Sequence, residues 1–275
     1  MKNADHCVTV SGTFDDIRSS DVRFLEEAAR LGSLHVLLWD DPTVRSATSA
    51  NPKFPEKERL YFLQAIRFVS KVSLVTLTGA DELPSVDGVL PSTWVVRENE
   101  NTTAKRVFCE SNDVTYQVLA KTDLAGFPQI IDAEPRATSG KKVLVTGCYD
   151  WFHTGHVRFF EEVSELGDLY VVVGHDANVR ALKGEGHPMF SQEERRYMAG
   201  SVRFVTQALI STGHGWLDAE PELKRIKPDI YAVNEDGDKP EKKKYCQENG
   251  IEYVVLKRLP KAGLPRREST VMRGF

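Results

Sequence analysis

The sequence predicts an α/β protein built from two tandem Rossmann-like domains, each with a doubly wound parallel sheet. Three observations predict this fold. Short apolar runs alternate with helical patterns, which is typical of parallel strands joined by crossover helices. The chain of 275 residues repeats itself at a domain-sized offset. A segment of small and polar residues separates the two halves, as expected of a linker.

The repeat is clearest where the first predicted strand of each half ends. Residues 8–15 read VTVSGTFD and residues 143–150 read VLVTGCYD, with their glycines 135 residues apart. The same offset relates VRFLEE at 22–27 to VRFFEE at 157–162. With one residue of slippage Arg67–Val69 matches Arg203–Val205, and with two residues Trp94–Glu98 matches Tyr231–Glu235 and Cys109 matches Cys246. A register held over most of each half indicates a tandem duplication of a whole domain.

The duplication sets the expected domain boundaries. Residues 133–140, AEPRATSG, are small, polar and rich in structure-breaking types. We therefore expect a first domain over residues 1–132, a linker over 133–140 and a second domain over 141–275.

The second half shows the elements most clearly. An apolar run at 142–146 predicts a strand buried on both faces, and 147–152 predicts a turn. Apolar residues at every third or fourth position predict a helix over 154–166, which Gly167 ends.

The remaining patterns continue the alternation. The capping box Ser191-Gln-Glu-Glu194 predicts a helix that runs to about Ser201. Right-handed crossovers would place the carboxyl ends of all strands, and a ligand, at one edge of the sheet. The other elements expected are strands at 169–173, 204–210, 229–233 and 252–256 and helices at 220–226 and 240–249.

Composition excludes several classes of protein. A net charge of −4 argues against a general nucleic-acid-binding protein, which would need a basic excess. No apolar run reaches the ~18–20 residues of a membrane span, and the first residues lack a secretory apolar region. The four cysteines have no CxxC spacing, so we expect free thiols in the cytoplasm and no zinc site.

The first strand of the second half ends in the segment GCYDWFHTGH, residues 147–156. This order places His153 and His156 at the start of a helix, where backbone N–H groups and the helix dipole favour anions. Gly155 between them would let a phosphate approach the backbone. A pair of ordinary surface histidines is the plain alternative. A dinucleotide-binding loop fails because no GxGxxG follows the strand.

These residues resemble the signature of the HxGH nucleotidyltransferase superfamily and, within it, the cytidylyltransferase-like family. That family includes glycerol-3-phosphate, choline-phosphate and ethanolamine-phosphate cytidylyltransferases, and adenylyltransferases acting on heptose phosphate or FMN. The resemblance covers residues 141 to about 272 and is fainter in the first half. The tandem layout is similar to that of ethanolamine-phosphate cytidylyltransferase.

The resemblance implies a set of site residues. It gives catalytic roles to His153, His156 and Lys183. It implies Mg²⁺ with the nucleotide, indirectly partnered by Asp150 or Asp238. The match departs at 265–268, where PRRE replaces the family's RTEGI and leaves the choice between CTP and ATP open. The nucleotide-binding residues that it implies are Gly147, Cys148, Tyr149, Asp150, Gly155, Gly237, Asp238, Arg266, Arg267, Ser269 and Thr270.

The implied activity is transfer of CMP from CTP to a phosphorylated small alcohol or sugar, with release of pyrophosphate. One alternative is an adenylyltransferase that uses ATP. An alternative of another class is a non-catalytic nucleotide-sensing or scaffold protein. We expect no nucleic-acid partner, and we expect the lysine-rich segment 239–244 to form an exposed helix face.

The first half lacks the chemistry of the second. Arg18, Ser20 and Asp21 stand where the second half has His153, Gly155 and His156. An aspartate would repel a triphosphate in a partly desolvated pocket. We therefore expect residues 1–132 to fold without catalysing and to pack on the second domain as an intramolecular pseudo-dimer, with homo-oligomerisation left open.

Overall fold

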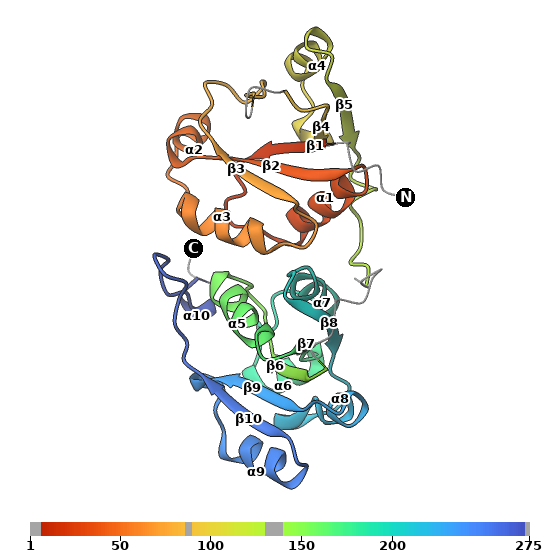
Figure 1. Cartoon of the computed structure of the whole chain (residues 1–275), viewed down its shortest axis with the longest axis vertical. Helices are drawn as coiled ribbons and strands as arrows, with labels where there is room; N and C mark the ends of the chain where they lie inside the picture. The colour runs from red at the N-terminus through yellow and green to blue at the C-terminus, as the bar shows by residue number, and fades with distance from the viewer. Residues whose placement is uncertain (1–6, 86–89, 130–139, 273–275) are drawn as a thin grey trace. The chain divides into compact units, whose positions relative to one another are not determined.

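The computed structural model describes residues 7–85, 90–129 and 140–272. The chain divides into two compact units, Met1–Gly126 and Phe127–Phe275. Each unit contains a parallel five-stranded sheet with helices on both faces, which confirms the predicted fold class (Figure 1). Of the expected linker, residues 133–139 lie outside the described residues.

The amino-terminal unit has the strand order β3-β2-β1-β4-β5. Helices α1 and α3 cover one face of its sheet and α4 covers the other (Figure 1). The elements are β1 (Cys7–Gly12), α1 (Ser19–Ala29), β2 (Ser33–Trp39), α2 (Asp41–Thr48), α3 (Glu56–Ala65), β3 (Lys71–Val75), β4 (Thr93–Arg97), η1 (Glu98–Glu100), α4 (Thr103–Ser111) and β5 (Thr115–Leu119).

The carboxy-terminal unit has the same topology, with the strand order β10-β9-β6-β7-β8. Helices α5 and α7 lie on one face of the sheet and α8 and α9 on the other (Figure 1). The elements are β6 (Lys142–Gly147), α5 (Thr154–Ser164), β7 (Asp168–Val173), α6 (Asp176–Lys183), α7 (Gln192–Gly200), β8 (Val205–Ile210), η2 (Gly215–Leu217), α8 (Glu220–Ile226), β9 (Ile230–Asn234), η3 (Glu235–Gly237), α9 (Pro240–Glu248), β10 (Glu252–Leu256) and α10 (Ser269–Met272).

One helix of the second unit, α6, is not predicted by the sequence patterns. Helix α6 is only eight residues long, and its N-cap is His175 instead of the usual Ser, Thr, Asp or Asn. The imidazole Nδ1 of His175 accepts a hydrogen bond from the Asn178 backbone N–H at 3.2 Å. His175 therefore caps the helix as a serine or an aspartate would. Because histidine is not one of the usual capping residues, the start of this helix cannot be recognised in the sequence.

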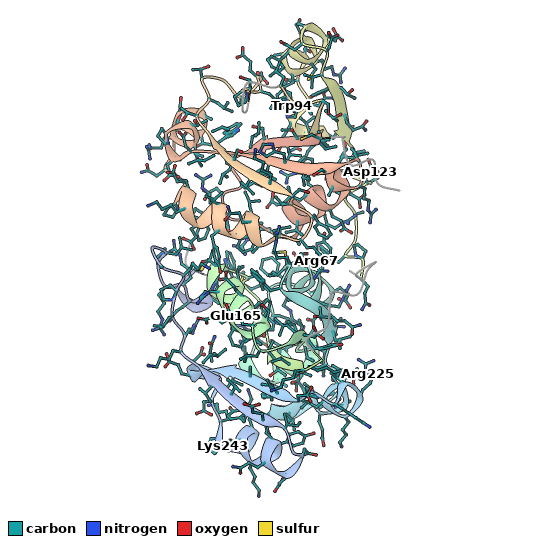
Figure 2. All side chains as sticks on the ribbon, in the orientation of Figure 1. Arg67, Trp94, Asp123, Glu165, Arg225 and Lys243 are labelled. Carbon is teal, nitrogen blue, oxygen red and sulfur yellow. The ribbon has the colours of Figure 1, made fainter. Side chains whose placement is uncertain are left out.

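The two cores are built alike. Trp94 and Cys109 are buried in a cluster against the first sheet, and Tyr231 and Cys246 occupy the matching places in the second. Figure 2 labels Trp94 within the amino-terminal unit. All four cysteines are free thiols, as predicted.

A buried arginine ties together the strand ends of the carboxy-terminal unit. The guanidinium of Arg195, on α7, donates to the carbonyls of Phe190 at 2.9 Å, Cys148 at 2.6 Å and Gly174 at 2.7 Å. It also pairs with the Asp176 carboxylate at 2.7 Å. Cys148 and Gly174 directly follow β6 and β7, so one side chain fixes both strands to the loop before α7.

Arg59, on α3, makes the same set of bonds in the amino-terminal unit. It donates to the carbonyls of Phe54 at 2.9 Å, Thr13 at 2.5 Å and Trp39 at 2.9 Å, and to the Asp41 carboxylate at 2.6 Å. Each partner matches its counterpart around Arg195 at the repeat offset. The duplication is therefore visible in individual hydrogen bonds.

Among the described residues, no helix combines the length and the apolar character needed to cross a lipid bilayer.

We expect Arg195→Met to destabilise the carboxy-terminal unit by about 3–5 kcal/mol, because it leaves three backbone carbonyls and the partly exposed Asp176 carboxylate without their donor. Hydrogen exchange followed by mass spectrometry would report the two units separately. Protection should fall in β6 and β7 and stay unchanged in β1 and β2. Arg59→Met should give the reverse pattern. Equal loss in both units from either variant would contradict this account.

Candidate active site

A cleft of about 420 Å³ lies at the carboxyl edge of the carboxy-terminal sheet. The ends of β6 and β9, the start of α5, the last residue of α6 and the start of α10 all contribute to it. This is the edge at which parallel doubly wound sheets bind ligands. Its lining residues that carry polar or charged side chains are Thr146, Cys148, Tyr149, Asp150, His153, His156, Lys183, His187, Asn234, Asp236, Lys242, Arg258, Glu268 and Ser269.

His153 is the N-cap of α5. Its Nδ1 accepts a hydrogen bond from the Gly155 backbone N–H at 3.0 Å, which requires a bare Nδ1 and, on the neutral ring, a proton on Nε2. A Cβ at Gly155 would lie 2.8 Å from Cε1 and 2.9 Å from Nδ1 of this imidazole. Gly155 is therefore needed so that His153 can cap the helix.

His156 lies in the first turn of α5, and its ring stacks on that of His153 with centroids 4.0 Å apart. Burial lowers the pKa of His156 well below its ordinary value, and the nearby groups His153, Arg258 and Lys183 lower it further. A neutral imidazole at the amino end of α5 can donate a hydrogen bond to an anion without a prior proton uptake.

The turn between β6 and α5 carries Cys148, Tyr149 and Asp150. Tyr149 has a left-handed backbone with φ of 52°. Its ring lies so close to Gly147 that a Cβ there would approach within 2.7 Å. The carbonyl of Cys148 is held by Arg195, and burial raises the pKa of its thiol. The turn is thus fixed by packing and by a buried hydrogen bond.

Asp150 joins this turn to the loop that precedes α7. Its Oδ1 accepts the backbone N–H groups of Met189 at 2.7 Å and Phe190 at 3.1 Å. In the amino-terminal unit, Asp15 binds the backbone N–H groups of Lys53 at 2.7 Å and Phe54 at 2.9 Å. Because both copies keep this clamp, we assign the carboxylate of Asp150 to the framework of the fold.

Lys183 is the last residue of α6 and lines the cleft with an exposed side chain. It lies on the side of the cleft that belongs to β7. The end of α6 therefore brings a positive charge toward the two histidines, as the resemblance implied for this lysine.

Two residues after β9, Gly237 and Asp238, are predicted to bind the nucleotide, and the structure places them differently. Gly237 lines the cleft, but Asp238 is exposed and does not. The Tyr253 hydroxyl donates to Asp238 at 3.0 Å, and Tyr116 makes the same bond to Asn101 at 3.2 Å in the other unit. The hydrogen bond of Asp238 thus belongs to the shared framework, and its expected place beside the nucleotide stays a prediction.

Two basic residues of the cleft were not predicted. Arg258 follows β10 by two residues, and its guanidinium pairs with Asp236 at 2.7 Å and donates to the Arg267 carbonyl at 3.3 Å. Its position just past a strand end was the available signal. Lys242 was expected on an exposed helix face, but it lines the cleft, while its neighbour Lys243 is exposed (Figure 2).

Lys242 belongs to the framework as well. Its ammonium contacts the Gly237 carbonyl at 3.3 Å and lies 5.8 Å from the centre of the Tyr231 ring. In the amino-terminal unit, Lys105 contacts the Glu100 carbonyl at 2.8 Å and lies 5.6 Å from the Trp94 ring. Burial lowers the pKa of Lys242.

The last motif is divided between two places. Ser269 lines the cleft and donates to the Trp151 carbonyl at 3.2 Å. Arg266 and Arg267 line a small hollow between α5 and the segment 257–267, which shares Gly155, Phe159, Asn234 and Arg258 with the cleft. Arg266 pairs with Glu268 at 3.2 Å, and the expected role of the two arginines at the nucleotide stays a prediction. The side chain of Thr270 lies outside the described residues.

The expected magnesium partners do not fit direct coordination. Asp150 is committed to two backbone N–H groups and Asp238 lies outside the cleft. Among the described residues, no three side chains of His, Cys, Asp or Glu gather as a metal-binding group. A magnesium ion that accompanies a triphosphate usually keeps several waters and binds phosphate oxygens, so we assign none of these side chains to it.

The same place in the amino-terminal unit carries different side chains. Asp21, which replaces His156, accepts a hydrogen bond from the Arg97 guanidinium at 2.7 Å. That guanidinium also lies 4.4 Å from the centre of the Phe24 ring. Trp39, which replaces Gly174, donates from its indole N–H to Ser11 at 2.8 Å. An ion pair thus stands in the amino-terminal unit where the other unit has its second histidine.

Comparison with known proteins agrees with this geometry. The model of a family described as cytidylyltransferase-like matches residues 144–257. The FAD synthase of Aciduliprofundum boonei is 36% identical over 125 residues, which cover 44% of this chain and 80% of that protein. The FAD synthase of Thermococcus kodakarensis is 40% identical over 96 residues, 34% of this chain and 62% of that protein.

Two further similarities are more limited. The bifunctional protein HldE of Campylobacter concisus is 39% identical over 98 residues, 35% of this chain but only 20% of that protein. The solved structure of a lipopolysaccharide core biosynthesis protein from Thermoplasma volcanium matches with a TM-score of 0.36 and 23% identity, over 46% of this chain and 98% of that one.

The contrast between the units predicts one nucleotide per chain. Calorimetric titration of the full chain with ATP and with CTP should give a stoichiometry near one for whichever nucleotide binds. The double variant His153→Ala/His156→Ala should lose at least about 100-fold in affinity, because it removes both imidazole donors. A site that survives undiminished in the double variant would place binding in the amino-terminal unit and contradict the prediction.

Proposed function

Because the chain belongs to the cytidylyltransferase-like family, we propose that its carboxy-terminal unit transfers a nucleotidyl group from a nucleoside triphosphate to a phosphorylated small molecule. The observation that carries this proposal is the pair of stacked imidazoles at the start of α5, inside a cleft that also holds Lys183 and Arg258. The amino-terminal unit is non-catalytic in this proposal.

ATP is the favoured nucleotide. Two of the relatives described above are FAD synthases, and FAD is FMN extended by an adenylyl unit. This favours the adenylyl alternative over the transfer of CMP from CTP that the motif first suggested. The replacement of the expected RTEGI stretch by PRRE at 265–268 fits a donor other than CTP.

The reaction is an in-line displacement at the α-phosphorus. A phosphate oxygen of the acceptor forms the new P–O bond, the bond to the β-phosphate oxygen breaks, and pyrophosphate leaves with the bonding electrons. The acceptor phosphate is already an anion, so no strong general base is required. Catalysis then consists of positioning and of stabilising charge on the phosphoryl oxygens.

The residues of the cleft have different roles in this positioning and charge stabilisation. His153 Nε2–H and the neutral ring of His156 hold phosphoryl oxygens, with the amino end of α5 behind them. Lys183 neutralises the leaving pyrophosphate from the β7 side. Arg258 supplies a second positive charge from the β10 side, with Asp236 holding its guanidinium in place.

A non-catalytic nucleotide sensor is the competing class. In the amino-terminal unit, the ion pair of Asp21 with Arg97 stands where the other unit has His156. The carboxy-terminal unit retains an open cleft with both histidines and Lys183. Retention of the complete set favours the enzyme.

A pyrophosphate-release assay tests the activity and the donor together. The full chain should release pyrophosphate with ATP in the presence of Mg²⁺ and a suitable acceptor, at least about tenfold faster than with CTP. The screen should include FMN, sugar phosphates and phosphorylated alcohols. Faster release with CTP would reverse the donor assignment, and binding without any release would favour the sensor.

His156→Ala should lower kcat by about 100- to 1000-fold, the usual effect of removing one preorganised donor to a developing negative charge. Steady-state kinetics with the best substrate pair would measure it. His35→Ala, a histidine of β2 in the amino-terminal sheet, is the control and should stay within threefold of the wild type. Activity of His156→Ala within threefold of the wild type would remove His156 from the mechanism.

A further inference from the structure

The aromatic residue at position 149 has a counterpart that lacks its hydroxyl. Phe14 occupies the same place in the amino-terminal unit, with a left-handed φ of 43° against 52° for Tyr149. The two side chains are equally buried, 7% and 6% exposed. Each ring lies against the glycine that ends the first strand, Gly12 or Gly147. The fold therefore needs an aromatic ring at this turn and does not need a hydroxyl.

The hydroxyl of Tyr149 is buried and has no hydrogen-bond partner among the described residues. A buried polar group without a partner costs free energy of folding, so an unused hydroxyl here would be worse than the plain phenyl ring of Phe14. Burial also raises the pKa of Tyr149, which keeps the phenol neutral and able to donate.

A second polar atom without a partner lies beside it. Nδ1 of His156 is buried and makes no hydrogen bond to any described residue. The His156 ring meets the Tyr149 ring edge to face, with centroids 5.3 Å apart. Both residues line the cleft. Two uncompensated polar groups on one wall of a cleft indicate a ligand that supplies their partners.

The surroundings indicate an anionic ligand. The wall lies at the amino end of α5, where the helix dipole favours negative charge. Lys183 and Arg258 are close enough to His156 to lower its pKa. In the part of the chain that the structure describes, three acidic residues line the cleft, and each has a partner: Asp236 pairs with Arg258, Glu268 pairs with Arg266, and Asp150 is bound by two backbone N–H groups.

We propose that the Tyr149 hydroxyl donates a hydrogen bond to a phosphoryl oxygen of the bound nucleotide, on the same phosphoryl group that His156 contacts. This inference rests on the proposed function and adds a residue that the amino-terminal copy does not share. The phenyl ring shapes the turn, and the hydroxyl holds the substrate.

Tyr149→Phe tests the proposal, since the other unit shows that phenylalanine fits this turn. The nucleotide-free variant should unfold at the same temperature as the wild type or at a higher one, by differential scanning calorimetry. Its kcat/KM in pyrophosphate release should fall about 10- to 100-fold, the usual effect of losing a hydrogen bond to a charged group. Its affinity for ATP by calorimetric titration should fall at least about threefold.

Two matched variants change a hydroxyl elsewhere. Tyr231→Phe removes a buried hydroxyl that is paired with Thr146 at 2.7 Å, so it should lower the unfolding temperature and keep kcat/KM within twofold. Phe14→Tyr adds a buried hydroxyl in the unit that lacks the two histidines, so it should also lower the unfolding temperature. The three variants thus separate a hydroxyl that serves the fold from one that serves the ligand.

Either of two results would overturn the inference. One is a Tyr149→Phe variant whose kcat/KM and ATP affinity stay within twofold of the wild type. The other is a loss of stability like that of Tyr231→Phe. If the wild type binds ATP but releases no pyrophosphate with any acceptor, the proposed function fails while the ATP titration still tests the hydroxyl. If the wild type binds CTP in place of ATP, the same comparison is made with CTP; if it binds neither nucleotide, both fail.

Discussion

The whole arrangement depends on one buried guanidinium in each unit. Arg195 and Arg59 are almost completely buried, and each gathers three backbone carbonyls and one carboxylate around a charge that could not be buried alone. Because two of these carbonyls directly follow the first two strands, the arginine fixes how the chain leaves the sheet. The turn from β6 to α5, and with it the pair of histidines, is built on this constraint.

The duplication lets structural and functional roles be separated inside one molecule. The clamps made by Asp150, the tyrosine contact of Asp238 and the cation over the ring of Tyr231 all recur in the amino-terminal unit. A contact that recurs in the copy without the two histidines serves the fold. The stacked histidines occur in only one copy, and that copy keeps an open cleft.

The sequence predicted the fold, and the structure brings His153, His156 and Lys183 together at one cleft, but the sequence said less about which loop residues line that cleft. Buried parallel strands and the repeat leave clear patterns, and HxGH is a local motif whose spacing fixes its place at a helix start. Asp238, Arg266 and Arg267 follow the last strands, where loop conformation decides which side chain turns inward. Arg258 was missed because its position follows from the path of the segment after β10, and helix α6 because its cap is a histidine.

The chain is slightly acidic overall, so its attraction for a triphosphate must be local. In the proposed reaction, groups that carry no full charge contribute to that attraction. The neutral His156 and the N–H groups at the start of α5 present fixed dipoles, and Lys183 and Arg258 add charge from two sides. Fixed dipoles need little reorganisation when charge moves from the α-phosphoryl oxygens to the leaving pyrophosphate. A site of protonated histidines would hold the ground state more tightly and gain less in the transition state. The low pKa of His156 is therefore part of what suits this cleft to group transfer.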